Sequence, residues 1–257
     1  MKILDFSGKT ALVTGAAGAI GKAVARQLIE DGASLVITDL KEEQVQAAAS
    51  ELGCTGMAAD VTNAEQVKKV VDFAIDRHGR IDILINVAGI VGQGLVEEIS
   101  EEEWDKMFAV NCKGTFLFTK YVVPQMKANR YGKIINYSSK SGKTGSALMS
   151  HYCAAKGAII SFTQALAYEL ADYSINVNCV CPGITDNSGV WASVSAGYTV
   201  NLQMPKDEVV KKFTAKIPLK RLATVNDVAA VTAFLASSGA DYMTGQAVNI
   251  TGGREMH

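Results

Sequence analysis

TALVTGAAGAIG, residues 10–21, joins a short apolar run to three glycines and to a helical pattern at Lys22–Glu30. Glycine at these places permits a tight turn and lets backbone N–H groups approach a pyrophosphate at the positive end of the helix. The spacing is not the literal GxGxxG, but the order of strand, loop and helix is that of a dinucleotide-binding unit. We therefore predict cofactor contacts at Gly15, Gly18, Ala19, Ile20 and Gly21.

An acidic residue ends the second apolar run, Ser34–Thr38. This residue, Asp39, lies 18 positions after Gly21, where a carboxylate can bond a ribose 2′-hydroxyl and repels a 2′-phosphate. Neither the glycine loop nor Leu40 offers a basic partner for such a phosphate. The sequence favours NAD over NADP, with Asp39 and Leu40 beside the cofactor; the alternative is that Asp39 is a solvated turn residue.

Apolar runs and helical patterns alternate along the whole chain. Further runs rich in β-branched residues occur at Ile81–Ile85, Lys133–Tyr137, Ile175–Val180 and Ala247–Ile250. Runs of this kind suit strands buried on both faces of a parallel sheet. Helical stripes lie between them, for example at Val67–Ile75 and after the capping signal at Thr224. The pattern predicts an α/β fold, a single doubly wound domain over residues 1–257.

One long stretch breaks the alternation. Pro182–Pro205 is rich in Gly, Ser and Asn and is predicted to be irregular, within a substrate lid spanning about residues 182–215. A helix is predicted at Asp207–Lys212. Trp191 and Tyr198 in the lid either stack on a sugar face or pack the loop shut.

Composition and charge exclude several classes of protein. Hydrophobic residues make up 48% and charged residues 20%, and 25 basic side chains nearly balance 26 acidic ones. This balance gives little reason to bind nucleic acid or anionic membrane. No apolar run reaches the roughly 18 residues of a membrane span, and the start, MKILDFSGKT, lacks the apolar core of a signal peptide. We expect a cytoplasmic protein.

The cysteines and histidines do not predict a metal site. Cys179 and Cys181 could indicate metal or redox chemistry, but alternation along a strand puts both on one face, where small buried cysteines are common. The five cysteines lack CxxC spacing, and the three histidines lack HxH or HExxH spacing.

A tyrosine and a lysine four residues apart form a candidate catalytic pair. Tyr152-Cys-Ala-Ala-Lys156 begins thirteen residues beyond Ser139, which follows a predicted strand. If Tyr152 opens a helix, both side chains share one face. An ammonium near a phenol lowers the phenol pKa from about 10, giving a general base for an alcohol. The alternative is an ordinary amphipathic helix with an exposed lysine.

These motifs occur together in one order: Thr14–Gly21, Asp60, Asn86-Val-Ala-Gly89, Asn111, Ser139, Tyr152, Lys156, Pro182-Gly183, Tyr242-Met-Thr-Gly-Gln246 and Thr251-Gly-Gly253. In this order, and over essentially the whole chain, they resemble the short-chain dehydrogenase/reductase family. The resemblance implies a Rossmann-type domain with a seven-stranded parallel sheet. It also implies a homotetramer, whose subunit contacts in the family come from the segments that match 101–127 and 152–171.

The resemblance assigns roles as well. Tyr152 would be the acid/base, Lys156 would lower its pKa and bond the nicotinamide ribose, and Ser139 would hold the substrate oxygen. Asn111 would hold a water in the proton relay. The further cofactor contacts that it implies are Asp60, Val61, Asn86, Ala88, Gly89, Pro182, Gly183, Ile184 and Thr185. The implied activity is the NAD-dependent interconversion of a secondary alcohol and its ketone.

Three positions depart from the usual family pattern. Ala19 stands where a glycine is common, and Val87 replaces the second Asn of the usual NNAG. Asn187 occupies the usual threonine position after Pro-Gly, while Thr185 comes two residues earlier. These departures leave the path of the glycine loop and one hydroxyl contact open.

The substrate is the least determined part of the sequence. Segments 139–145, 217–221 and 249–253 look most like polyol dehydrogenases of the sorbitol-6-phosphate type, so a polyol, sugar or sugar phosphate is expected. Lys140 and Lys143 either meet a phosphate or carboxylate as point charges or are solvated loop lysines. A 3-oxoacyl thioester reductase is the alternative enzyme, against which Asp39 argues because that activity normally pairs with NADP. A non-catalytic nucleotide-binding regulator is a further alternative.

Overall fold

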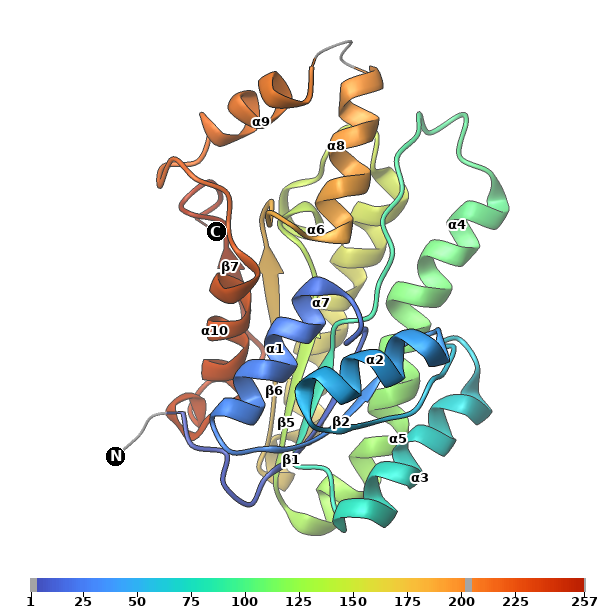
Figure 1. The fold of residues 1–257 in the computed structure, drawn as a ribbon, viewed down its shortest axis with the longest axis vertical. Helices are drawn as coiled ribbons and strands as arrows, with labels where there is room; N and C mark the ends of the chain where they lie inside the picture. Colours follow the sequence, from blue (N-terminus) through green and yellow to red (C-terminus); the bar gives the residue numbers. More distant parts are fainter. Residues whose placement is uncertain (1–3, 202–204, 257) are drawn as a thin grey trace.

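The computed structural model describes residues 4–201 and 205–256 and contains one sheet of seven parallel strands (Figure 1). The strand order is β3-β2-β1-β4-β5-β6-β7. The strands are β1 (Thr10–Thr14), β2 (Ser34–Thr38), β3 (Thr55–Gly56), β4 (Ile83–Asn86), β5 (Gly132–Tyr137), β6 (Ile175–Pro182) and β7 (Ala247–Ile250). The predicted α/β class and doubly wound parallel sheet are confirmed.

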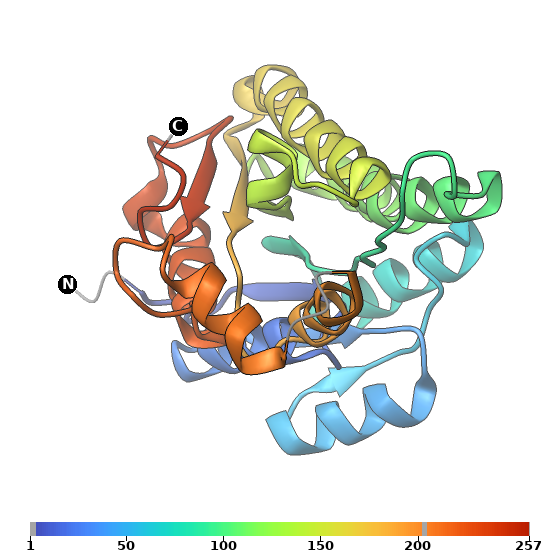
Figure 2. The same cartoon turned by 90° about the horizontal axis from the view of Figure 1, so that it is seen from above.

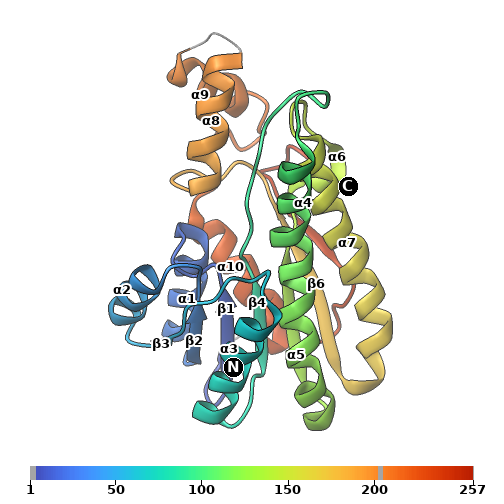
Figure 3. The same ribbon diagram turned by 90° about the vertical axis from the view of Figure 1, so that its right-hand side faces the viewer.

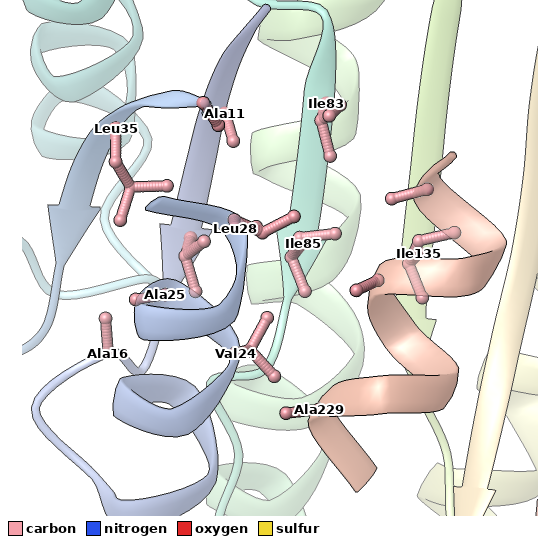
Figure 4. Packing of buried hydrophobic residues seen from close by; sticks show 14 of the residues in the cluster. Ala11, Ala16, Val24, Ala25, Leu28, Leu35, Ile83, Ile85, Ile135 and Ala229 are labelled. Carbon is pink, nitrogen blue, oxygen red and sulfur yellow. The ribbon is translucent and has the colours of Figure 1, made fainter. Parts of the chain in front are cut away.

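Helices cover both faces of this sheet (Figure 2). One layer comprises α1 (Ala19–Glu30), α2 (Glu42–Leu52) and α10 (Val225–Ala236), and the other comprises α3 (Ala64–His78), α5 (Gly114–Asn129) and α7 (Ser150–Leu170). Successive side chains of a strand point alternately to the two faces of the sheet: Ala11 and Val13 pack in the first core, and Leu12 packs in the second. Figure 4 shows Val24, Ala25 and Leu28 of α1 packed towards the sheet beside α10. This two-sided burial explains the continuous apolar runs of the strands.

The direction of winding reverses next to β1. The chain passes outward from β1 to β2 and β3, then returns to add β4 on the other side of β1. In open sheets of this kind, ligands bind outside the carboxyl ends of the strands at the reversal point. The topology therefore places a site above Thr14 and Asn86, the last residues of β1 and β4.

The segment 101–127, which matches a subunit-contact segment of the family, is helical with one interruption. Helix α4 (Glu101–Phe108) begins at a capping box made by Ser100 and Glu103, and a π-helical turn, η1 (Ala109–Lys113), separates it from α5. Such turns are rare and are found frequently at functional sites. The remaining short elements are α6 (Lys140–Thr144), η2 (Ala171–Tyr173) and η3 (Ser238–Ala240).

The lid is more regular than the sequence indicates. Helix α8 (Gly189–Asn201) occupies most of Pro182–Pro205, so the prediction of an irregular stretch is wrong there; α9 (Lys206–Thr214) confirms the next helix. Trp191, Val194 and Ser195 are buried at helical spacing, a stripe that the surrounding glycines and serines obscure. Both helices stand at one end of the molecule (Figure 3). Residues 202–204 of the predicted lid, and the side chain of Tyr198, lie outside the described residues.

Every helix in the described part of the chain is too short or too polar to span a membrane. No cluster of three or more His, Cys, Asp or Glu side chains in this part of the chain has the arrangement of a metal site. All five cysteines are free thiols.

Candidate active site

A cavity of about 670 Å³ opens where the topology places a site. Its walls come from the glycine loop, the ends of β2, β4, β5 and β6, the start of α7, and the lid helices. Of the predicted catalytic, cofactor and substrate residues whose side chains the structure describes, all except Asn86, Asn111 and Lys143 line it. The structure thus brings the cofactor motif and the Tyr-Lys pair into one hollow.

Two glycines make the loop after β1 possible. Gly15 has a φ of +64°, and a Cβ there would lie 2.8 Å from the Ala88 backbone. A Cβ on Gly21 would collide with the carbonyl oxygen of Gly15. These contacts press the start of α1 against the loop and bring β1 close to the end of β4. Ala19, the departure from the family pattern, is the first residue of α1 and fits there without distortion of the helix.

The N-terminus of α1 suits an anion. Gly18 is its N-cap, so no side chain caps the first N–H groups, and the first turn holds no acidic residue. Asn63, Ser100 and Thr224, by contrast, cap α3, α4 and α10 with their side chains. An uncapped helix start that faces a cavity leaves backbone N–H groups and a positive dipole end for a phosphate. The residues present therefore fit the pyrophosphate of a dinucleotide.

Asp39 is fixed at the edge of this cradle. Its Oδ2 accepts a hydrogen bond from the Ala17 N–H at 3.0 Å, and its Oδ1 accepts one from the Leu40 N–H at 2.7 Å. Leu40 is exposed and brings no positive charge. A half-buried carboxylate held by two backbone donors cannot move far from a ligand placed against it. Asp60, farther along the cavity, is ordered by the Thr62 N–H and hydroxyl, each 2.8 Å from its Oδ1.

Ser139, Tyr152 and Lys156 meet at the other end. Ser139 follows β5 as the N-cap of α6, where its Oγ accepts from the Ser141 N–H at 3.1 Å. Tyr152 is the third residue of α7, and Lys156 lies one turn later. The Lys156 Nζ donates to the Tyr137 carbonyl oxygen at 2.9 Å and lies 5.8 Å from the centre of the Tyr152 ring. The predicted helical face shared by tyrosine and lysine is confirmed.

The pKa of Tyr152 differs from the expectation. Burial raises the pKa of Tyr152 to about 12, although hydrogen bonding with Ser139 opposes the shift. Burial likewise lowers the pKa of Lys156 to about 8. The expected lowering of the phenol pKa by Lys156 is not observed here, because both groups are buried and the ammonium is held by a carbonyl instead of the phenol. Tyr152 is therefore protonated at neutral pH, the state needed to donate a proton to a carbonyl oxygen.

Asn111 lies just beneath the cavity in the π-helical turn. Its Nδ2 donates to the carbonyl oxygens of Ile90 and Met107, both at 3.0 Å, while its Oδ1 is buried without a hydrogen-bond partner among the described residues. A Cβ on Gly89 would lie 2.6 Å from that Oδ1 and 3.1 Å from the Lys156 Nζ. Gly89 thus lies between the unpaired Asn111 Oδ1 and the Nζ of the buried Lys156.

Two other predicted residues have structural contacts instead. The Asn86 Nδ2 donates to Asn136 Oδ1 at 2.9 Å, joining β4 to β5 inside the core. The Lys143 Nζ donates to the Ala247 carbonyl oxygen at 2.6 Å, outside the cavity lining. Asn187 occupies the usual threonine position of the family after Pro-Gly, but it is exposed and does not line the cavity. Thr185, two residues earlier, is buried and does line it.

Sequence reasoning missed part of the cavity wall. Phe213 of α9 and Arg254 beyond β7 both line it, and the Phe213 ring lies edge-on to Trp191 with centroids 5.9 Å apart. The only available signals were the glycine pair before Arg254 and the apolar spacing of the lid helices. Neither signal shows that Phe213 and Arg254 reach the same cavity, because only the fold brings these two segments together.

A dinucleotide cradle joined to a Ser-Tyr-Lys set defines a nicotinamide-dependent oxidoreductase on a Rossmann-type fold. The family model described as enoyl-(acyl carrier protein) reductase matches residues 15–255. Sorbitol dehydrogenase of Cereibacter sphaeroides is 38% identical over 98% of this chain and 100% of its own. The 3-oxoacyl-[acyl-carrier-protein] reductase FabG of Vibrio cholerae is 37% identical over 98% and 100%. The chain belongs to the short-chain dehydrogenase/reductase family and is an oxidoreductase.

Two solved structures show the same fold. A single-substitution variant of actinorhodin polyketide ketoreductase with NADPH superimposes with a TM-score of 0.94 at 33% identity, covering 97% of this chain and 98% of the other. NAD⁺-bound xylitol dehydrogenase gives a TM-score of 0.91 at 33% identity, covering 96% and 99%. Polyol dehydrogenases and ketoacyl reductases are therefore about equally similar to this chain.

Proposed function

We propose that this oxidoreductase is an NAD-dependent dehydrogenase that interconverts the secondary alcohol of a polyol, sugar or sugar phosphate with the ketone. One observation carries the proposal: Ser139, Tyr152 and Lys156 share a cavity with a cradle whose edge is the fixed carboxylate of Asp39. The bound dinucleotide would supply the hydride acceptor or donor. The whole chain would act as one catalytic domain, with residues 182–215 as its lid.

Each polar group of the cavity then has a task. Tyr152 gives its proton to the ketone oxygen during reduction and takes the hydroxyl proton during oxidation. Ser139 hydrogen-bonds the same oxygen and stabilises the charge that develops on it. Lys156 bonds the nicotinamide ribose, and its positive charge stabilises the negative charge that Tyr152 carries once it has given up its proton. The free Oδ1 of Asn111 holds a water on the path to Lys156.

The cofactor is held along the opposite wall. The uncapped start of α1 with Gly15, Gly18, Ala19, Ile20 and Gly21 holds the pyrophosphate, and Asp39 and Leu40 lie beside the adenosine ribose. The remaining contacts in this proposal are Asp60, Val61, Ala88, Gly89, Pro182, Gly183, Ile184 and Thr185. Asn86 supports this wall from within the core.

The assay for this function is NAD reduction by the purified protein over polyols, their phosphates and 3-hydroxyacyl thioesters, repeated with NADP. Turnover of polyols or their phosphates with NAD supports the proposal. Preference for acyl thioesters with NADP would establish the alternative, a 3-oxoacyl thioester reductase, which the FabG relative keeps open. NAD binding without turnover of any alcohol or ketone would favour a regulatory role.

The preference for NAD is tested by Asp39→Ala. The fixed carboxylate repels a 2′-phosphate, so removing it should raise kcat/KM with NADP relative to NAD by about 10- to 100-fold, the effect of one close charge contact. Glu43→Ala removes an exposed carboxylate from nearby α2 and serves as the matched control. An unchanged NADP to NAD ratio in Asp39→Ala would contradict the assignment.

A homotetramer and a cytoplasmic location belong to the same proposal. Phe116 of α5 and Tyr168 of α7 are 43% and 88% exposed on helices of one layer, leaving large aromatic surface for a subunit contact. Light scattering that gives the mass of a monomer would contradict the tetramer. Five free thiols suit a reducing compartment, which fractionation of the source cells would test.

A further inference from the structure

The end of the cavity near Tyr152 carries excess positive charge. Lys140 enters it from α6, and Arg254 enters from the turn after β7. They share the carboxylate of Glu255, whose Oε1 lies 3.2 Å from the Arg254 Nε and 4.0 Å from the Lys140 Nζ. Two basic side chains and one acidic side chain thus meet at this end of the cavity, with a formal net charge of about +1.

Two glycines and two side-chain hydrogen bonds fix the shape of the turn that contains Arg254. Gly252 and Gly253 have φ values of +64° and +89°, and a Cβ on Gly252 would lie 2.7 Å from the Ile217 side chain. The Thr251 hydroxyl and the Asn249 amide both donate to the Glu255 carbonyl oxygen, at 3.0 and 3.1 Å. These bonds close the turn, so the position of Arg254 is set by backbone contacts and not by its own side chain.

The Arg254 guanidinium is only partly satisfied. Its Nε pairs with Glu255, but its Nη1 is buried without a hydrogen-bond partner among the described residues. The central carbon of the group lies 5.6 Å from the centre of the Phe213 ring, and that ring packs against Trp191. This contact with the Phe213 ring holds the guanidinium at the cavity wall, where Nη1 is still without an acceptor. A buried N–H without a partner is costly and calls for an acceptor.

Lys140 is also a largely buried basic group close to Arg254. Its Nζ donates to the Ser146 hydroxyl at 2.9 Å, and its side chain is 15% exposed. Burial, and then the charge of Arg254, lower the pKa of Lys140, while Glu255 opposes that shift. The surroundings of Lys140 therefore disfavour its protonated form, and a bound anion would stabilise that form.

We propose that Arg254 and Lys140 form an anion subsite, so that the substrate is an alcohol or ketone bearing a carboxylate or phosphate. The identity of the reacting group rests on the proposed function above, but the subsite does not. A planar guanidinium edge beside an ammonium suits the oxygens of either anion. Glu255 keeps the two cations in place until the anion binds.

The first test compares matched substrates: a polyol with its phosphate, and a hydroxy acid with its methyl ester. Arg254→Gln and Lys140→Gln should each lower kcat/KM for the charged member by about 10- to 100-fold, mainly through KM, and leave the neutral member unchanged. Lys212→Gln, on the exposed side of α9, is the control for loss of one positive charge. Equal losses on both members, or weaker NAD binding, would overturn the subsite.

A second test needs no turnover. Inorganic phosphate and acetate are titrated into the NAD-saturated protein by calorimetry, and the tighter of the two identifies the anion class. Binding to the wild type that falls at least about tenfold in Arg254→Gln supports the subsite even if every alcohol is inert. Lys140→Gln gives the same comparison if Arg254→Gln does not fold. Absence of binding, together with preference for neutral substrates, would overturn it.

Discussion

Replacing Tyr152 by Phe should lower kcat by about 10²- to 10⁴-fold, the range for loss of a positioned general acid or base. The ring packs in the cluster of Met107, Met149 and Trp191, and Phe keeps those contacts while losing the hydroxyl. NAD affinity should be unchanged, because the glycine loop and Asp39 lie at the other end of the cavity. Single-turnover hydride transfer and fluorescence titration of NAD would measure the two effects separately.

Tyr168→Phe is the matched control for this result. Tyr168 lies on the same helix, α7, outside the cavity, so the substitution removes an identical hydroxyl while keeping the ring that the proposed subunit contact uses. Its activity should equal that of the wild type. If Tyr152→Phe retained more than about a tenth of wild-type kcat, the assignment of Tyr152 as acid/base would be wrong.

The sheet could be predicted because its signal is local. The runs Ser34–Thr38 and Ala247–Ile250 match the strands at both ends, and all of the first run except Ser34 is buried. The strand β3, Thr55–Gly56, has two residues and no pattern to detect. Helix α8 was missed because its buried stripe, including Trp191 and Val194, is embedded in glycine and serine, which usually indicate loops.

The site was predictable where a residue's role depends on its neighbours in sequence. Tyr152 and Lys156 fall on one face by helical spacing alone. The pKa of Tyr152 depends instead on burial and on the hydrogen bond with Ser139, and Lys156 is held by the carbonyl of Tyr137 at the end of β5. Arg254 reaches the cavity through a turn at the far end of the chain. Such contacts are properties of the assembled fold.

Lys156→Met should lower kcat/KM by about 10²-fold or more, since it removes a charge that acts on both proton transfer and the ribose. Met replaces the buried stem at similar volume, and the Tyr137 carbonyl loses its donor. The same variant has a signature in stability. Burial lowers the pKa of Lys156 to about 8, below its usual 10.5. Between these pH values the unfolded chain binds the proton more tightly than the folded protein does.

Stability contributed by Lys156 must therefore rise with pH through this window. Relative to Lys156→Met, the wild-type free energy of unfolding should increase by on the order of 1 kcal/mol per pH unit between pH 8 and 10. Chemical denaturation without cofactor, in steps of half a pH unit, would measure this difference. Titration of other groups cancels, because both proteins contain them. Lys212→Met, an exposed substitution on α9, should run parallel to the wild type. A flat difference between wild type and Lys156→Met would mean that Lys156 stays protonated in the folded protein throughout this range.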